Sequence, residues 1–210
     1  HGHIATNPAA HIHPRVEKRQ ISPMTPEQAT AFLAAVDGHR LAPLYRVALS
    51  LGLRRGEIIA LRWTDVDLGG KTLKIKKAKT AAGVRTIPLP DKLADVLSDH
   101  WGYQQQERLL TGVEWKEHGL VFPSEVGTPL VPRNLVRHFK SVLNRAGLPE
   151  TIRFHDLRHS CATFLIAQGV HIKTISEILG HASIGITMDV YGHVSADTQR
   201  TALDKIADMF

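Results

Sequence analysis

Hydrophobic residues recur at helical spacing along most of the chain, in blocks separated by glycine, proline and polar turns. The block after Thr25 opens with Pro26 and carries Gln28 three residues beyond the threonine, the pattern of a capping box. This pattern predicts a helix from Thr25 to about Val36. The same spacing predicts further helices over Leu41–Leu51, Asp91–Leu109, Pro132–Ala146 and Asp197–Met209.

One region alternates between apolar and polar residues instead. Leu73 and Ile75 are separated and followed by lysines, and a second alternating run, Val84–Leu89, begins directly after Gly83. Two alternating runs joined by a glycine-containing turn predict a β-hairpin. The patterns together predict a mainly α fold with a small antiparallel β-sheet, an α+β class.

The C-terminal third predicts a helix that begins near His155 and stops near Gly169. Its apolar face consists of Leu157, Cys161, Phe164 and Leu165. His155 and Arg158 are three residues apart, so we expect them to share one face near the helix N-terminus, where free N–H groups favour an anion. Arg158 is expected to project away from the core. For His159 the pattern leaves either face open.

A second short helix is expected over Ile172–Leu179 and ends at Gly180, which leaves His181 just past its C-terminus. Tyr191 follows ten residues later, between the segment Ile184–Val190 and the final amphipathic run. His181 and Tyr191 thus follow shortly after the helix that carries Arg158.

Composition narrows the class of protein. The chain has 210 residues, 43% of them hydrophobic, which suffices for one folded domain, and a formal net charge of +6, which suits a polyanionic partner. The single cysteine, Cys161, excludes an internal disulfide and a multi-cysteine zinc site and is expected to fill the core. No apolar run reaches about 18 residues, so we expect no membrane insertion and a cytoplasmic location.

The motifs described above occur in the same order in a known protein family. His155-Asp156-Leu157-Arg158-His159, then Leu179-Gly180-His181, then Tyr191, together with Gly52-Leu53-Arg54-Arg55-Gly56-Glu57, resemble the signature of the tyrosine recombinase (phage integrase) family. The resemblance implies a DNA strand-breaking and rejoining enzyme of phage, transposon or chromosomal systems, acting in DNA integration, transposition or recombination in the bacterial nucleoid.

The resemblance also implies roles for individual residues. Tyr191 is the nucleophile that forms a 3′-phosphotyrosyl link, and Arg54 and Arg158 hold the scissile phosphate, since each guanidinium grips two oxygens. Lys79 of the hairpin would protonate the leaving 5′ oxygen, with Lys77 as the alternative. The remaining members of the catalytic set are Glu57 as a support, His155 for proton handling and His181 as a donor to the phosphate. No metal or other cofactor is expected.

The implied partner is double-stranded DNA, including a Holliday junction. Basic residues expected to contact DNA are Arg55, Lys74, Lys76, Lys77, Arg85, Arg133, Arg137 and Lys140. A solvated helix face is the alternative for the basic helix Pro132–Ala146. We expect a monomer alone and a homotetramer on DNA joined through the helix 197–209, with DNA-bending accessory proteins as possible partners. Packing of that helix on its own core is the alternative.

Residues 1–22 lack periodicity and are expected to form a linker, with the catalytic domain over 23–210 and an upstream core-binding domain absent. Two alternative functions use the same residues: a type IB topoisomerase-like or telomere-resolving enzyme, and an inactive DNA-binding accessory factor. A metal-dependent hydrolase is disfavoured because no carboxylate pair accompanies the histidines.

Overall fold

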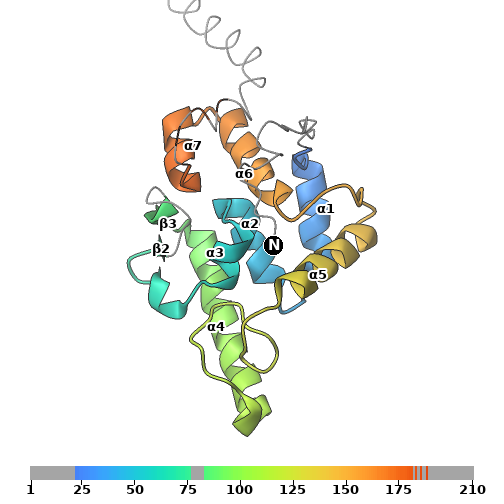
Figure 1. Cartoon of the computed structure of the whole chain (residues 1–210), viewed down its shortest axis with the longest axis vertical. Coiled ribbons are helices and arrows are strands. Elements are labelled where there is room, and N and C mark those ends of the chain that lie inside the picture. The colour runs from blue at the N-terminus through green and yellow to red at the C-terminus, as the bar shows by residue number, and fades with distance from the viewer. Residues whose placement is uncertain (1–21, 77–82, 182, 184, 186–187, 189–210) are drawn as a thin grey trace, which may run out of the picture.

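The computed structural model describes residues 22–76, 83–181, 183, 185 and 188 of the chain. They form a mainly helical fold with one small antiparallel sheet, as the sequence predicts (Figure 1). The helices are α1 Pro26–Val36, α2 Ala42–Leu51, α3 Arg55–Ile59, α4 Asp91–Thr111, α5 Pro132–Arg145, α6 Asp156–Ala167 and α7 Ile172–Leu179. Two 3₁₀ turns are η1 Trp63–Asp65 and η3 Gly112–Glu114.

The sheet has three strands in the order β1-β2-β3, with β1 Val66–Asp67, β2 Thr72–Ile75 and β3 Arg85–Pro88. All pairs are antiparallel, and Ile75 lies opposite Arg85. The predicted hairpin is thus confirmed as β2 and β3. The sequence pattern does not predict β1, because a two-residue strand is too short to show alternation.

Local sequence explains where the helices begin and end. The Thr25 side chain accepts a hydrogen bond from the Gln28 N–H, and the Gln28 side chain accepts one from the Thr25 N–H, so the predicted capping box of α1 is confirmed. Helices α2 and α7 end at Gly52 (φ 60°) and Gly180 (φ 66°), whose left-handed backbone favours glycine. These two glycines later prove to border the candidate site.

The core lies where α1, α2, α5 and the start of α6 pack together. Phe32, Tyr45 and Phe139 are fully buried and meet edge-on or tilted, with ring centroids 5.2–6.1 Å apart. Cys161 is also buried, and burial raises the pKa of its thiol to about 12. The prediction that Cys161 is a small core residue is therefore confirmed.

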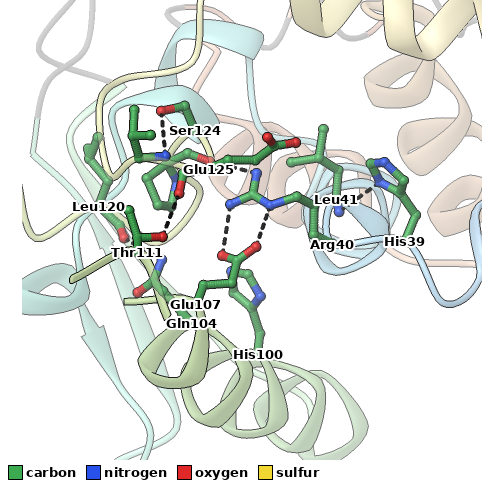
Figure 2. A network of polar contacts seen from close by, with 12 residues as sticks. His39, Arg40, Leu41, His100, Gln104, Glu107, Thr111, Leu120, Ser124 and Glu125 are labelled. Atoms are coloured by element: carbon green, nitrogen blue, oxygen red, sulfur yellow. Dashed lines mark hydrogen bonds and ion pairs between the residues drawn. The ribbon is translucent and has the colours of Figure 1, made fainter. Parts of the chain in front are cut away.

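Helix α4 projects from the end of the molecule opposite α6 and α7 and is held to the body by a polar network (Figures 1 and 2). Arg40 donates twice to the Glu107 carboxylate, at 2.7 and 2.9 Å, and once to the Pro123 carbonyl at 2.9 Å. His100 donates from Nε2 to the Val121 carbonyl at 2.7 Å. Arg40 and Glu107 are both largely buried, so this ion pair fixes the C-terminal part of α4 against the turn between α1 and α2.

Among the helices that the structure describes, none is both long and apolar enough to cross a bilayer.

Candidate active site

Three segments that are distant in sequence meet on one side of the molecule. They are the turn between α2 and α3, the N-terminal turn of α6 and the C-terminal end of α7 (Figure 1). They meet because α2 packs against α6, α6 packs against α7, and α7 packs against β3. Each segment carries one of the motifs identified in the sequence.

Arg54 precedes α3 and points toward the end of α7. Its Nη1 donates to Glu57 Oε1 at 2.7 Å, and its Nη2 donates to the Gly180 carbonyl at 2.9 Å. The side chain keeps 34% of its surface exposed. Arg54 is therefore fixed at two points while about a third of its side chain remains accessible to solvent.

Arg158 lies in the first turn of α6 and is buried, with a relative exposure of 3%. Its Nη1 donates to the Gly52 carbonyl at 2.8 Å. The expectation that Arg158 projects away from the core is wrong, because the α2 C-terminus covers this face of α6 and offers its last carbonyl to the guanidinium. A cation at a helix C-terminus is stabilised by the helix dipole.

The two arginines are held reciprocally. Arg54 donates to Gly180, next to His181, while Arg158 donates to Gly52, two residues before Arg54. An alanine Cβ at Gly52 would come within 2.4 Å of Leu179 Cδ2. Glycine at this position therefore lets the α2 end approach α7 closely, which brings the segments that carry the motifs together.

Glu57 accepts hydrogen bonds from two arginines of the site. It is 8% exposed and accepts hydrogen bonds from the Arg54 N–H at 3.0 Å and from Arg85 Nη2 at 3.1 Å, besides the bond from Arg54 Nη1. Burial alone raises the pKa of Glu57, but the hydrogen bonds from Arg85 and Arg54 outweigh burial and lower it. Glu57 is thus an ionised carboxylate between two arginines, which it holds by hydrogen bonds.

Three histidines surround the arginines. The His155 and His159 rings are 4.9 Å apart at the start of α6, and His181 follows α7 and is half-buried. Burial lowers the pKa of His159 and of His181 to about 4, with smaller effects from His155 on His159 and from Arg158 on His181. The His155 side chain lies at the surface. Partial loss of water around its ring, and then the charge of Arg158, lower its pKa as well. All three rings are therefore neutral near pH 7.

The predicted DNA-contact residues differ in their surroundings. Arg55, Lys74, Lys76, Arg133 and Arg137 are exposed, and Lys76 pairs with Asp65 at 2.5 Å. Lys140 is half-buried and donates to the carbonyls of Glu150 and Ile152. Tyr191, Lys79 and Lys77 lie outside the described residues, as does the predicted helix 197–209.

Arg85 departs most from the expected DNA-contact role. Its side chain is 7% exposed, and its guanidinium donates to Glu57, to the Ile178 carbonyl at 2.6 Å and to the Gly83 carbonyl at 2.8 Å. The expectation of a DNA contact is corrected here, because β3 faces α7 and turns this side chain inward. The sequence offers one signal for an internal role: Arg85 stands two residues before Ile87, and residues two apart in a strand share one face.

The site as described supplies two guanidiniums, one carboxylate and three neutral imidazoles within a few turns of three helices. Such a set binds a phosphodiester, stabilises charge on its oxygens and moves protons. No group of three or more histidine, cysteine or acidic side chains suited to a metal ion occurs in the described ranges.

Comparison with known proteins gives the family. The model of the phage integrase family matches residues 22–198. The chain is 34% identical over 216 residues to a "Tyrosine recombinase XerC-like" protein of Caldanaerobacter subterraneus subsp. tengcongensis, a match that covers 91% of this chain and 55% of that one. It is 34% identical over 186 residues to an integrase of Streptomyces ambofaciens, which covers 80% of this chain and 48% of the integrase.

A solved structure has the same fold. The Tn1549 transposon integrase in complex with transposon right end DNA has a TM-score of 0.74 and 22% identity, covering 91% of this chain and 67% of that one. The chain spans about half the length of the two relatives named above. The family model matches residues 22–198 and the XerC-like relative is 34% identical over 91% of this chain, so the chain belongs to the phage integrase family of tyrosine recombinases.

Proposed function

We propose that this chain is the catalytic part of a site-specific DNA recombinase. Arg54 and Arg158 bind the scissile phosphate, and Tyr191 attacks its phosphorus. The bond from phosphorus to the 5′ oxygen breaks, the 5′ oxygen takes a proton from Lys79, and a 3′-phosphotyrosyl link remains. His155 takes the tyrosine proton, and His181 donates to a non-bridging oxygen.

The observation that carries this proposal is the reciprocal anchoring of Arg54 and Arg158 by Gly180 and Gly52. Two guanidiniums fixed by protein carbonyls are set in advance for the charge that develops on the phosphate oxygens, and this preorganisation lowers the barrier. The neutral histidines fit proton transfer, because a neutral imidazole both accepts and donates. A 5′-hydroxyl from a second strand then attacks the phosphotyrosyl link and releases Tyr191, which rejoins DNA through a Holliday junction.

The proposed partner is double-stranded DNA, bound by a tetramer on two recombination sites, with residues 23–210 as the catalytic domain and 197–209 joining neighbouring protomers. The exposed arginines on α3 and α5 suit DNA backbone contacts. Related folds support the DNA partner, since the Tn1549 integrase is described in complex with DNA. Light scattering with and without DNA tests the assembly, and a stable tetramer without DNA contradicts it.

The decisive experiment incubates full-length protein with nicked duplexes from the ends of the DNA element that encodes it, in EDTA. We expect a covalent protein–DNA band on a denaturing gel that is lost in Tyr191→Phe. If the wild-type protein binds the DNA but gives no covalent band, the protein is an inactive DNA-binding protein instead. Joining of strands from two different duplexes separates a recombinase from a topoisomerase.

A further inference from the structure

Arg85 connects three parts of the candidate site. It donates from Nη2 to Glu57 at 3.1 Å, from Nε to the Ile178 carbonyl at 2.6 Å and from Nη1 to the Gly83 carbonyl at 2.8 Å. Glu57 holds Arg54, and Ile178 lies in the last turn of α7, three residues before His181. The planar guanidinium thus sets the distance between the support of Arg54 and the helix that presents His181.

The end of α7 is fitted closely to this side chain. A Cβ on Gly180 would lie 2.7 Å from Arg85 Nη1 and 3.0 Å from Arg85 Cζ. Gly180 is also the residue whose carbonyl accepts from Arg54 at 2.9 Å. A shift of α7 relative to the hairpin would therefore break the hydrogen bond from Arg54 to Gly180 and, at the same time, displace His181.

From these contacts we infer that Arg85 is a positioning residue for cleavage, which aligns Arg54 and His181 on the same phosphate through Glu57 and the C-terminus of α7. The inference rests on the proposed function and adds a residue to it. Arg85 does not touch DNA, because its side chain is 7% exposed and three of its donors are used inside the protein.

The test measures single-turnover formation of the covalent complex on the nicked duplex, at saturating DNA, together with the dissociation constant. Arg85→Met is expected to slow cleavage about 100-fold while the dissociation constant changes by less than about threefold. Arg108→Met is the control for the same substitution elsewhere. Arg108 lies in the last turn of α4, distant from the site, and pairs with Glu117. This control is expected to cleave at the wild-type rate.

A second substrate identifies the step that Arg85 serves. A duplex with sulfur in place of the bridging 5′ oxygen releases a thiolate, which leaves without protonation because its pKa is much lower than that of an alcohol. Lys79→Ala is expected to regain wild-type cleavage on this duplex. Arg85→Met is expected to stay slow on it, because its defect lies in holding the phosphate. Recovery of Arg85→Met on the sulfur duplex would overturn the inference.

Arg85→Lys separates positioning from charge. A lysine keeps the charge but cannot reach Glu57 and the Ile178 carbonyl in one plane, so cleavage is expected to stay at least about tenfold slow. Wild-type cleavage by Arg85→Lys, or a loss of DNA affinity alone in Arg85→Met, would overturn the inference. If Arg85→Met does not fold by circular dichroism, Arg85→Lys decides. A wild type without a Tyr191-dependent band overturns the proposed function as well, whereas equal bands from wild type and Arg85→Met overturn only this inference.

Discussion

Arg54 donates from Nη2 to the carbonyl oxygen of Gly180 at 2.9 Å, across a sequence separation of 126 residues. The carbonyl belongs to the residue that ends α7, so the arginine lies at the negative end of a helix dipole. The opposite edge of the guanidinium is held by Glu57 at 2.7 Å. Its remaining exposed surface, 34% of the side chain, is the part available to a phosphate.

Replacing Arg54 by lysine keeps the charge but removes this geometry. We expect Arg54→Lys to form the covalent complex at least about 100-fold more slowly, because one ammonium cannot reach Glu57, Gly180 and a phosphate together. Single-turnover cleavage of the nicked duplex measures the effect. Arg46→Lys is the control, since the Arg46 side chain is 39% exposed, similar to that of Arg54, and pairs with Asp37 away from the candidate site. Cleavage by Arg54→Lys within threefold of wild type would contradict the role.

Gly52→Ala tests the close approach of α2 and α7. An alanine there meets Leu179 Cδ2 at 2.4 Å and must also adopt φ near 60°, so we expect a loss of roughly 3 kcal/mol in the free energy of unfolding. Gly38→Ala is matched, because Gly38 has φ 73° and an added Cβ would meet nothing within 4 Å. It should cost only about 1 kcal/mol. Urea unfolding compares them, and equal losses would refute the steric argument.

The ion pair of Arg40 and Glu107 is expected to contribute to stability. Glu107→Gln leaves a largely buried arginine without its carboxylate, which should lower the free energy of unfolding by about 2 kcal/mol. Asp37→Asn breaks the pair with Arg46, whose side chains are 39% and 70% exposed, and should cost less than about 0.5 kcal/mol. Urea titration of both variants checks the difference, and a smaller effect at Glu107 than at Asp37 would contradict it.

Acid should destabilise the fold through His138, which is half-buried. Burial, and then His39 and Arg145, lower the pKa of His138 to about 4, and Tyr45 Oη lies 2.8 Å from its Nδ1. Between pH about 6.5 and 4 the unfolded chain binds more protons at this residue than the folded one, so stability falls as the pH falls.

His138→Gln removes this titration and retains a polar partner for Tyr45. Between pH 7.5 and 5 we expect the melting temperature of the variant to fall about 3 °C less than that of wild type, with allowance for solvent reaching the ring. Thermal unfolding at both pH values measures this, and an equal fall in the two proteins would show that His138 titrates normally.

Local patterns predicted the helices well because their signals are local. The capping box at Thr25 and the glycines at 52 and 180 mark element ends through contacts within a few residues. The motif residues Arg54, Arg158 and His181 were also predicted to converge, on the strength of a family resemblance. Burial of Arg158 was missed, since no sequence spacing reveals that the end of α2 covers α6.

Long-range ion pairs could not be predicted. Arg40 and Glu107 are 67 residues apart, and Arg85 and Glu57 are 28 apart on different elements. Nothing in either local sequence identifies its partner, so Arg85 was assigned to DNA with the other cations of the hairpin. Its contacts with Glu57 and the end of α7 are explained by the packing of β3 against α7.

During synthesis of the chain, Arg54 is made before the Gly180 carbonyl that anchors it. A ribosome makes Arg54 long before Gly180, so a nascent or truncated chain ending before α7 carries the first arginine without the carbonyl that orients it. Arg158 has the Gly52 carbonyl as soon as α6 can fold onto α2. The pair is complete only after the segment just before His181 has been made, and unfinished chains therefore lack the oriented pair on which the proposed cleavage depends.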